Sequence, residues 1–151
     1  MKGYPAGFPR LLYMTLVALF VSGLALAPNA LDTRLELNVE WWSLGSGTRV
    51  WVAAAHAASV FIMLTLLGAL WTIHMRAGWI RRENVVAGLI LVTAFALLAI
   101  SGLLLYYAGD ELTGQIALGL HLFAGLTLPA WLAAHFIGAI GAKRRCHLRQ
   151  P

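Results

Sequence analysis

Long apolar runs separated by short polar stretches dominate the pattern of the chain. Four runs stand out, at about residues 11–27, 50–73, 85–107 and 116–142. A helix needs roughly 20 predominantly apolar residues to cross a bilayer. An irregular backbone in lipid would leave peptide groups without hydrogen-bond partners. The pattern therefore predicts an all-α fold, a four-helix transmembrane bundle that forms one membrane domain over residues 1–151.

The polar stretches predict how these helices connect. Pro28-Asn29 predicts the end of the first helix, and an external loop is expected from there to about Arg49. Within the loop, leucines among charges are followed by Trp41-Trp42, a pattern that fits a segment along the membrane surface with the tryptophans at headgroup depth. Simple interfacial anchoring is the favoured interpretation, and docking of a partner is the alternative. The turns near residues 75–84 and 108–115 are short. Helices two and three are therefore expected to be antiparallel neighbours, and helices two and four to run in parallel. The sequence shows no strong internal repeat.

Charge gives the expected orientation. The chain is 60% hydrophobic and 11% charged, about half the usual share of charge for a soluble domain. The net charge is +5, and most of the basic residues flank the ends that share a side with both termini. The positive-inside rule therefore predicts cytoplasmic termini. No basic face is interleaved with stacking aromatics outside the membrane, which argues against nucleic acid as a partner. The basic residues on the terminal side are Lys2, Arg10, Arg76, Arg81, Arg82, Lys143, Arg144, Arg145 and Arg149.

The N-terminal segment and the single cysteine each suggest a function that we do not assign. Lys2 and Arg10, an apolar run and the end at residues 25–27 also fit a cleavable signal peptide, but we interpret the segment as a retained helix. The single cysteine, Cys146, precedes His147 without the Cys-x-x-Cys-His spacing that attaches haem covalently. We interpret it as a surface thiol without a role.

Histidine is costly inside a membrane, so an intramembrane histidine is a functional candidate by default. His56 and His74 lie on the second predicted helix, and His121 and His135 on the fourth. At about 100° per residue, each pair lines one stripe of its helix. Because the two helices run in parallel, His56 and His121 are expected near the external side, and His74 and His135 near the cytoplasmic side.

Two imidazoles at each level suit iron, because a haem iron takes two axial ligands. The vertical fit is imperfect: about 1.5 Å of rise per residue gives roughly 27 Å on helix two and 21 Å on helix four. Helix tilt or a kink at Pro129 must absorb the difference. The alternatives are histidines that hydrogen-bond between helices, an interfacial His74 that ligates nothing, and zinc, which needs three or four ligands.

Glycines and basic residues near the histidines extend the candidate site. Gly125 follows His121 by four residues and Gly138 follows His135 by three, so each shares a face with a histidine and leaves room for haem. Ordinary close helix packing is the alternative reading. Arg49 is a candidate partner for haem propionates at the external level, with topology anchoring as the alternative. The corresponding candidates at the cytoplasmic level are Arg76, Arg81, Arg82 and Lys143.

These residues match a known family. The spacing His121-x13-His135, in LHLFAGLTLPAWLAAHFIGAIG, and the segment SGLLLYYAGDE at Ser101–Glu111 resemble the bacterial four-helix di-haem cytochrome b family. This family includes the membrane anchor subunits of formate dehydrogenase and of nickel–iron hydrogenase. The resemblance implies that His121 and His56 ligate an external haem b, and that His135 ligates a cytoplasmic one. The anchor subunits commonly supply the last ligand from helix one, which has no histidine here, so His74 would replace it.

The resemblance also implies a function. It implies a b-type cytochrome of the bacterial inner membrane, with two haem b groups, or one, and no catalytic residues of its own. Such a protein carries electrons between the quinone pool and an external redox subunit or c-type cytochrome, as part of a larger oxidoreductase rather than as a stand-alone enzyme. One alternative is a haem-free transporter or proton-conducting bundle, which predicts acidic groups inside the helices. The other is a structural membrane subunit.

Overall fold

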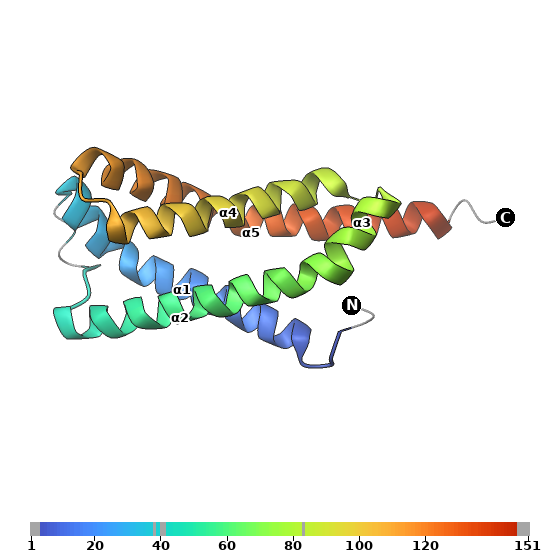
Figure 1. Ribbon diagram of the computed structural model, residues 1–151, viewed down its shortest axis with the longest axis horizontal. Coiled ribbons are helices and arrows are strands. Elements are labelled where there is room, and N and C mark those ends of the chain that lie inside the picture. The colour runs from blue at the N-terminus through green and yellow to red at the C-terminus, as the bar shows by residue number, and fades with distance from the viewer. Residues whose placement is uncertain (1–3, 38, 40–41, 83, 148–151) are drawn as a thin grey trace.

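The computed structural model describes residues 4–37, 39, 42–82 and 84–147. This part of the chain is helical, and it contains four segments that are long and apolar enough to cross a membrane (Figure 1). These segments are Phe8–Leu35, Ser46–Arg81, Val85–Tyr107 and Glu111–Ala139. The predicted all-α fold with four membrane helices is confirmed.

The first helix is longer than the sequence predicted. Helix α1 spans Phe8–Leu35 and passes through Pro28, so the predicted end at Pro28-Asn29 was wrong. A proline inside a helix removes one backbone hydrogen bond, and membrane helices tolerate it where neighbouring groups compensate. Next to it, the Asn29 side chain donates to the Leu44 carbonyl at 3.1 Å and accepts the Leu44 N–H at 2.9 Å. These two bonds hold the following loop against α1, and Glu36, with φ 52°, ends the helix.

The predicted external loop is therefore shorter than expected. It runs between α1 and helix α2, which spans Ser46–Leu70. The predicted placement of the Trp41-Trp42 pair at the membrane surface falls partly outside the described residues, because Trp41 is not among them.

Helix α2 does not end where its apolar run ends. It continues into a π-helical turn, η2, at Trp71–Met75 and then into helix α3 at Arg76–Arg81. Figure 1 shows the chain bending at this point, so that α3 runs toward α5. Single π turns inside α-helices are uncommon and occur frequently at functional sites. Arg82 and Asn84, both with φ 52°, then reverse the chain.

The last two helices form an antiparallel pair joined by a short turn. Helix α4 spans Val85–Tyr107 and helix α5 spans Glu111–His147, with Pro129 inside it. Helix α5 begins earlier than the predicted residue 116, because Asp110 caps it. The Asp110 carboxylate accepts the Thr113 N–H at 2.8 Å, which satisfies one of the free N–H groups at the start of the helix.

The bundle consists of two helical hairpins. The closest packing joins α4 to α5 and α1 to α2, and α1 also packs against α5. The second and third membrane helices are antiparallel, and Phe95 of α4 packs against the buried cluster between α1 and α2. The tightest packing nevertheless lies within each hairpin, and the bend at η2 carries the connection toward α5. Leu12 of α1 packs with Met63, Leu66 and Leu70 of α2 in a buried core within the first hairpin.

Candidate functional site

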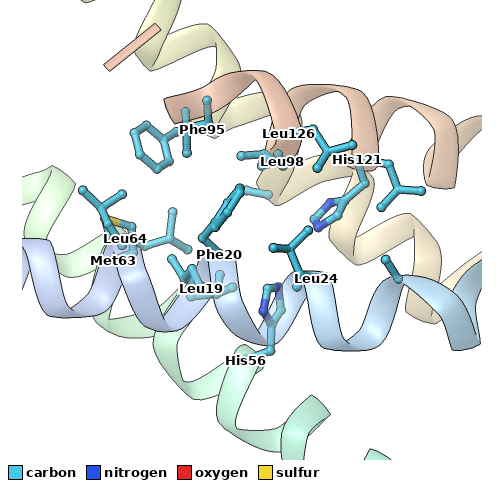
Figure 2. Close-up of a pocket in the computed structure, with 18 of the residues that line it drawn as sticks. Leu19, Phe20, Leu24, His56, Met63, Leu64, Phe95, Leu98, His121 and Leu126 are labelled. Atoms are coloured by element: carbon cyan, nitrogen blue, oxygen red, sulfur yellow. The ribbon is translucent and has the colours of Figure 1, made fainter. Parts of the chain in front are cut away.

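The first site brings together two histidines, one from each hairpin. His56 of α2 and His121 of α5 have ring centroids 6.4 Å apart, with 66° between the ring planes. Figure 2 shows the two imidazoles pointing toward one another from opposite walls of a cavity, with Phe20 and Leu24 of α1 beside them. Both histidines are half-buried.

The second site repeats this arrangement farther along the same helices. The rings of His74 and His135 have centroids 6.1 Å apart and planes at 70°. His74 lies in the π turn η2, which winds more residues into a turn than an α-helix does. The π turn and the bend after it reduce the distance between His56 and His74 along the helix axis. From the sequence, that distance was longer than the one between His121 and His135. His135 is half-buried, whereas His74 is exposed.

Three polar side chains contact the Nδ1 atoms of these rings. The Ser22 hydroxyl of α1 lies 2.7 Å from Nδ1 of His56, and the Ser101 hydroxyl of α4 lies 3.0 Å from Nδ1 of His121. At the second site the Asn84 amide donates to the backbone carbonyl of His135 at 2.8 Å and lies 3.4 Å from its Nδ1. Histidines that bind metals typically donate a hydrogen bond from their second nitrogen. The two hydroxyl oxygens can accept such a bond, whereas the Asn84 N–H cannot.

Glycines lie beside three of the imidazoles. A Cβ atom on Gly23 would be 3.4 Å from Cε1 of His56, and one on Gly102 would be 3.3 Å from Cε1 of His121. A Cβ on Gly88 would be 3.9 Å from Cε1 of His135. Gly23 and Gly102 directly follow the two serines in the chain. Each Ser-Gly pair therefore supplies both a hydrogen-bonding group and the space for the ring.

A cavity of about 250 Å³ adjoins the first histidine pair. All four membrane helices line it, and His56 and His121 are the only polar side chains among its described lining residues. Leucine is the commonest residue type in the wall. An apolar space with two convergent nitrogen donors is typical of a site for a large apolar cofactor.

The other candidate residues lie in different places. Gly125 lines the cavity, whereas a Cβ on Gly138 would be 2.8 Å from the Asn84 amide oxygen, so Gly138 makes room for that side chain. Arg49 is exposed in the first turns of α2. It lies two turns before His56 on the same helical face. Arg76 begins α3 beside His74 and is exposed, Arg81 and Arg82 end that helix, and the Lys143 side chain lies outside the described part.

The spacing of the rings fits one metal ion between each pair. A metal–imidazole bond is about 2 Å long, and a ring centroid lies roughly 1 Å behind its nitrogen, given ordinary bond lengths. Two imidazoles on opposite sides of one metal therefore have centroids about 6 Å apart, as both pairs do. Within the described part of the chain, no group of three or more His, Cys, Asp or Glu side chains is placed to hold a metal ion. Two nitrogen donors per site suit the axial positions of a haem iron better than a tetrahedral zinc ion.

The sequence analysis did not identify Ser22, Gly23, Asn84 or Ser101 as site residues. A usable signal was present, because the dipeptide Ser-Gly occurs once in the first and once in the third apolar run. Comparison of the chain with protein-family models, with curated proteins and with solved structures found no match. The geometry of the two histidine pairs is therefore the main indication of function.

Proposed function

We propose that the protein is a membrane-bound b-type cytochrome that carries electrons between the quinone pool and a redox partner. The supporting observation is that two histidine pairs, each with one ring from either hairpin, have centroids 6.4 and 6.1 Å apart. That spacing fits one metal ion held from both sides by imidazole nitrogens. Chance packing of four membrane histidines would not be expected to produce this spacing twice.

The residues of the chain have separate tasks in this proposal. His56 and His121 would hold one haem through their Nε2 atoms, and His74 and His135 would hold the second. A haem held by two imidazoles would supply transfer of single electrons and would not bind a substrate at its iron. The leucines of the cavity exclude water, and Gly23 and Gly102 leave the rings free to face the cavity. Arg49, exposed two turns from His56, is placed to pair with a carboxylate at that end.

The quinone and the partner enter from the resemblance of the sequence to di-haem anchor subunits. Oxidation of a quinol releases two electrons and two protons, and a one-electron carrier passes those electrons on singly. The described part of the chain consists of membrane-length helices and their connections. We therefore assign it the role of an electron-carrying subunit of a larger oxidoreductase in a bacterial inner membrane.

The test is the absorption spectrum of the full chain, purified in detergent after expression with ample haem. We expect the spectrum of low-spin haem with two imidazole ligands, and reduction when a quinol is added to the oxidised protein. Reduction by dithionite but not by quinols would remove the quinone and keep the electron carrier. A colourless protein would contradict the proposal and favour a haem-free conducting bundle or a structural subunit.

A further inference from the structure

At the first site, each hairpin places a Ser-Gly pair of one helix beside a histidine of the other helix. In the first hairpin, Ser22-Gly23 of α1 faces His56 of α2. In the second, Ser101-Gly102 of α4 faces His121 of α5. In each, the serine contacts Nδ1 of the ring and the glycine faces its Cε1.

The hydrogen bonds of the serines decide which ring nitrogen carries the proton. A hydroxyl has one hydrogen to donate and can accept two hydrogen bonds. The Ser22 hydroxyl lies 2.5 Å from the Ala18 carbonyl, and the Ser101 hydroxyl lies 2.6 Å from the Leu97 carbonyl. A carbonyl oxygen can only accept, so each serine uses its hydrogen there. Each serine oxygen must then accept a hydrogen bond from the ring that it contacts.

We infer that Ser22 and Ser101 are positioning residues that fix His56 and His121 as Nδ1–H tautomers, leaving both Nε2 lone pairs free for one shared ligand. This inference deepens the proposed function and depends on it for its redox consequence. Burial supports the assignment, because Ser101 is only 1% exposed and water cannot readily replace its bonds. A ring that donates from Nδ1 is a more basic ligand through Nε2.

At the second pair, the side chain recorded beside Nδ1 of His135 is an amide and not a serine hydroxyl. Asn84 directs its amide N–H mainly to the backbone carbonyl of His135, and its contact with Nδ1 is longer, at 3.4 Å. An amide N–H cannot accept a proton from the ring, so it does not select the Nδ1–H form. The inference therefore separates the two pairs: His56 and His121 are prepared as ligands before anything binds, and His135 is not prepared in this way.

The test that needs no haem is nitrogen-15 solid-state NMR of the full chain in lipid bilayers, with labelled histidine and expression under haem depletion. We expect protonated Nδ1 and unprotonated Nε2 at His56 and His121, whose signals are assigned with His56→Gln and His121→Gln. Ser22→Ala should remove this preference at His56 alone, and Ser101→Ala at His121 alone. Ser22→Thr, which keeps the hydroxyl, should retain it.

Ser59→Ala is the matched control. Ser59 of α2 donates to the Ala55 carbonyl at 2.8 Å, as the other two serines donate to carbonyls of their own helices. Among the described residues, no histidine ring is hydrogen-bonded to it. This variant should leave all histidine signals unchanged. Protonated Nε2 at His56 and His121 in the wild type, or unchanged tautomers in both Ser22→Ala and Ser101→Ala, would overturn the inference.

A second readout uses protein that holds haem. Loss of a hydrogen bond to a metal-binding histidine typically weakens metal affinity by about 10-fold or more, so Ser22→Ala and Ser101→Ala should release haem more readily. Their midpoint potential should shift to more positive values, because a less basic ligand stabilises ferric iron less. If the wild-type protein binds no haem but shows the expected tautomers, the proposed function is wrong and the tautomer inference stands. The NMR and haem measurements therefore distinguish failure of the proposed function from failure of the inference.

Discussion

His56 and His121 face one another across an apolar cavity with ring centroids 6.4 Å apart, although they belong to different helical hairpins. Helices α2 and α5, which carry them, are not among the closest-packed pairs of the bundle. The two rings thus approach each other where the helix backbones do not pack tightly. This arrangement leaves space for a bound group between elements that are held in place by their own hairpin partners.

The first prediction concerns the ligand role of His121. His121→Ala removes one of the two imidazoles at this site, so we expect the purified protein to retain only the haem at the His74–His135 pair. Haem extracted per chain should fall by about half, while helical content stays unchanged by circular dichroism. His147→Ala, in the basic tail, is the control and should bind as much haem as the wild type. Unaltered haem content in His121→Ala would rule out this assignment.

The second prediction concerns the space beside the ring. A Cβ on Gly102 would lie 3.3 Å from Cε1 of His121, and the two methyl groups of valine add further bulk. Because Ser101 and the ring are packed closely there, Gly102→Val should displace the imidazole and weaken haem binding at least 10-fold, on the scale of supporting-residue losses. Gly68→Val is the matched control, since nothing lies within 4 Å of a Cβ at that glycine. Equal haem affinity in the two variants would show that the space beside His121 is not needed.

The third prediction concerns the two hydrogen bonds between Asn29 of α1 and Leu44 of the following loop. Asn29→Ala removes both hydrogen bonds to Leu44, each worth about 1 kcal/mol, so unfolding in detergent should become easier by about 2 kcal/mol. Asn29→Asp keeps the acceptor for the Leu44 N–H and loses the donor, so it should cost less than Asn29→Ala. A loss in Asn29→Ala no larger than that in Asn29→Asp would mean that the bond accepted from the Leu44 N–H contributes nothing.

The fourth prediction concerns acid stability. Hydrogen bonds from Thr113, first from its side chain and then from its backbone N–H, hold the pKa of Asp110 below its ordinary value of 3.8. A lowered pKa in the folded protein stabilises the fold above pH 3.8, and this contribution is lost as the pH falls through the folded pKa. Asp110→Asn retains an acceptor for the Thr113 N–H and does not titrate.

The difference in unfolding stability between the wild type and Asp110→Asn should therefore be constant above pH 3.8 and shrink or reverse below it. The other acidic groups titrate in both proteins, so their contributions to the pH dependence of stability cancel in this difference. Chemical unfolding followed by circular dichroism across this range measures the difference. A difference that stays constant down to the lowest pH would show that the capping bond does not depend on the charge of Asp110.

The sequence predicted the helices and the proximity of the histidines because both follow from local rules. Apolar length sets the number of membrane helices, and helical periodicity puts His56 and His74, or His121 and His135, on a stripe of one helix. Parallel helices then bring the stripes to matching levels. None of these steps needs knowledge of the packing.

The extension of α1 and the π turn depend on contacts that a sequence does not display. Pro28 is a reliable helix-ending signal on average, but here Asn29 and Leu44 hold the backbone that follows it. The π turn at Trp71–Met75 bends the chain toward α5. The sequence predicted that His74 and His135 share a level, but not the turn that brings their rings together.

The supporting serines were missed for a different reason. A serine in a membrane helix commonly donates its hydroxyl to a carbonyl of its own helix, and such a residue usually has no further role. Ser22 and Ser101 make that bond too, so their sequence context is ordinary. The backbone bond does not distinguish these two serines from Ser59, which makes the same bond. The glycine that follows each of them does, but its meaning depends on the positions of His56 and His121 on neighbouring helices.

The central claim is that the protein holds haem between paired histidines. The most direct measurement is a dithionite-reduced minus oxidised spectrum of the purified wild type, with extracted haem quantified per chain. The account predicts two b-type haems per chain, and a single one would restrict the claim to the His56–His121 pair. No haem after haem-replete expression would contradict it.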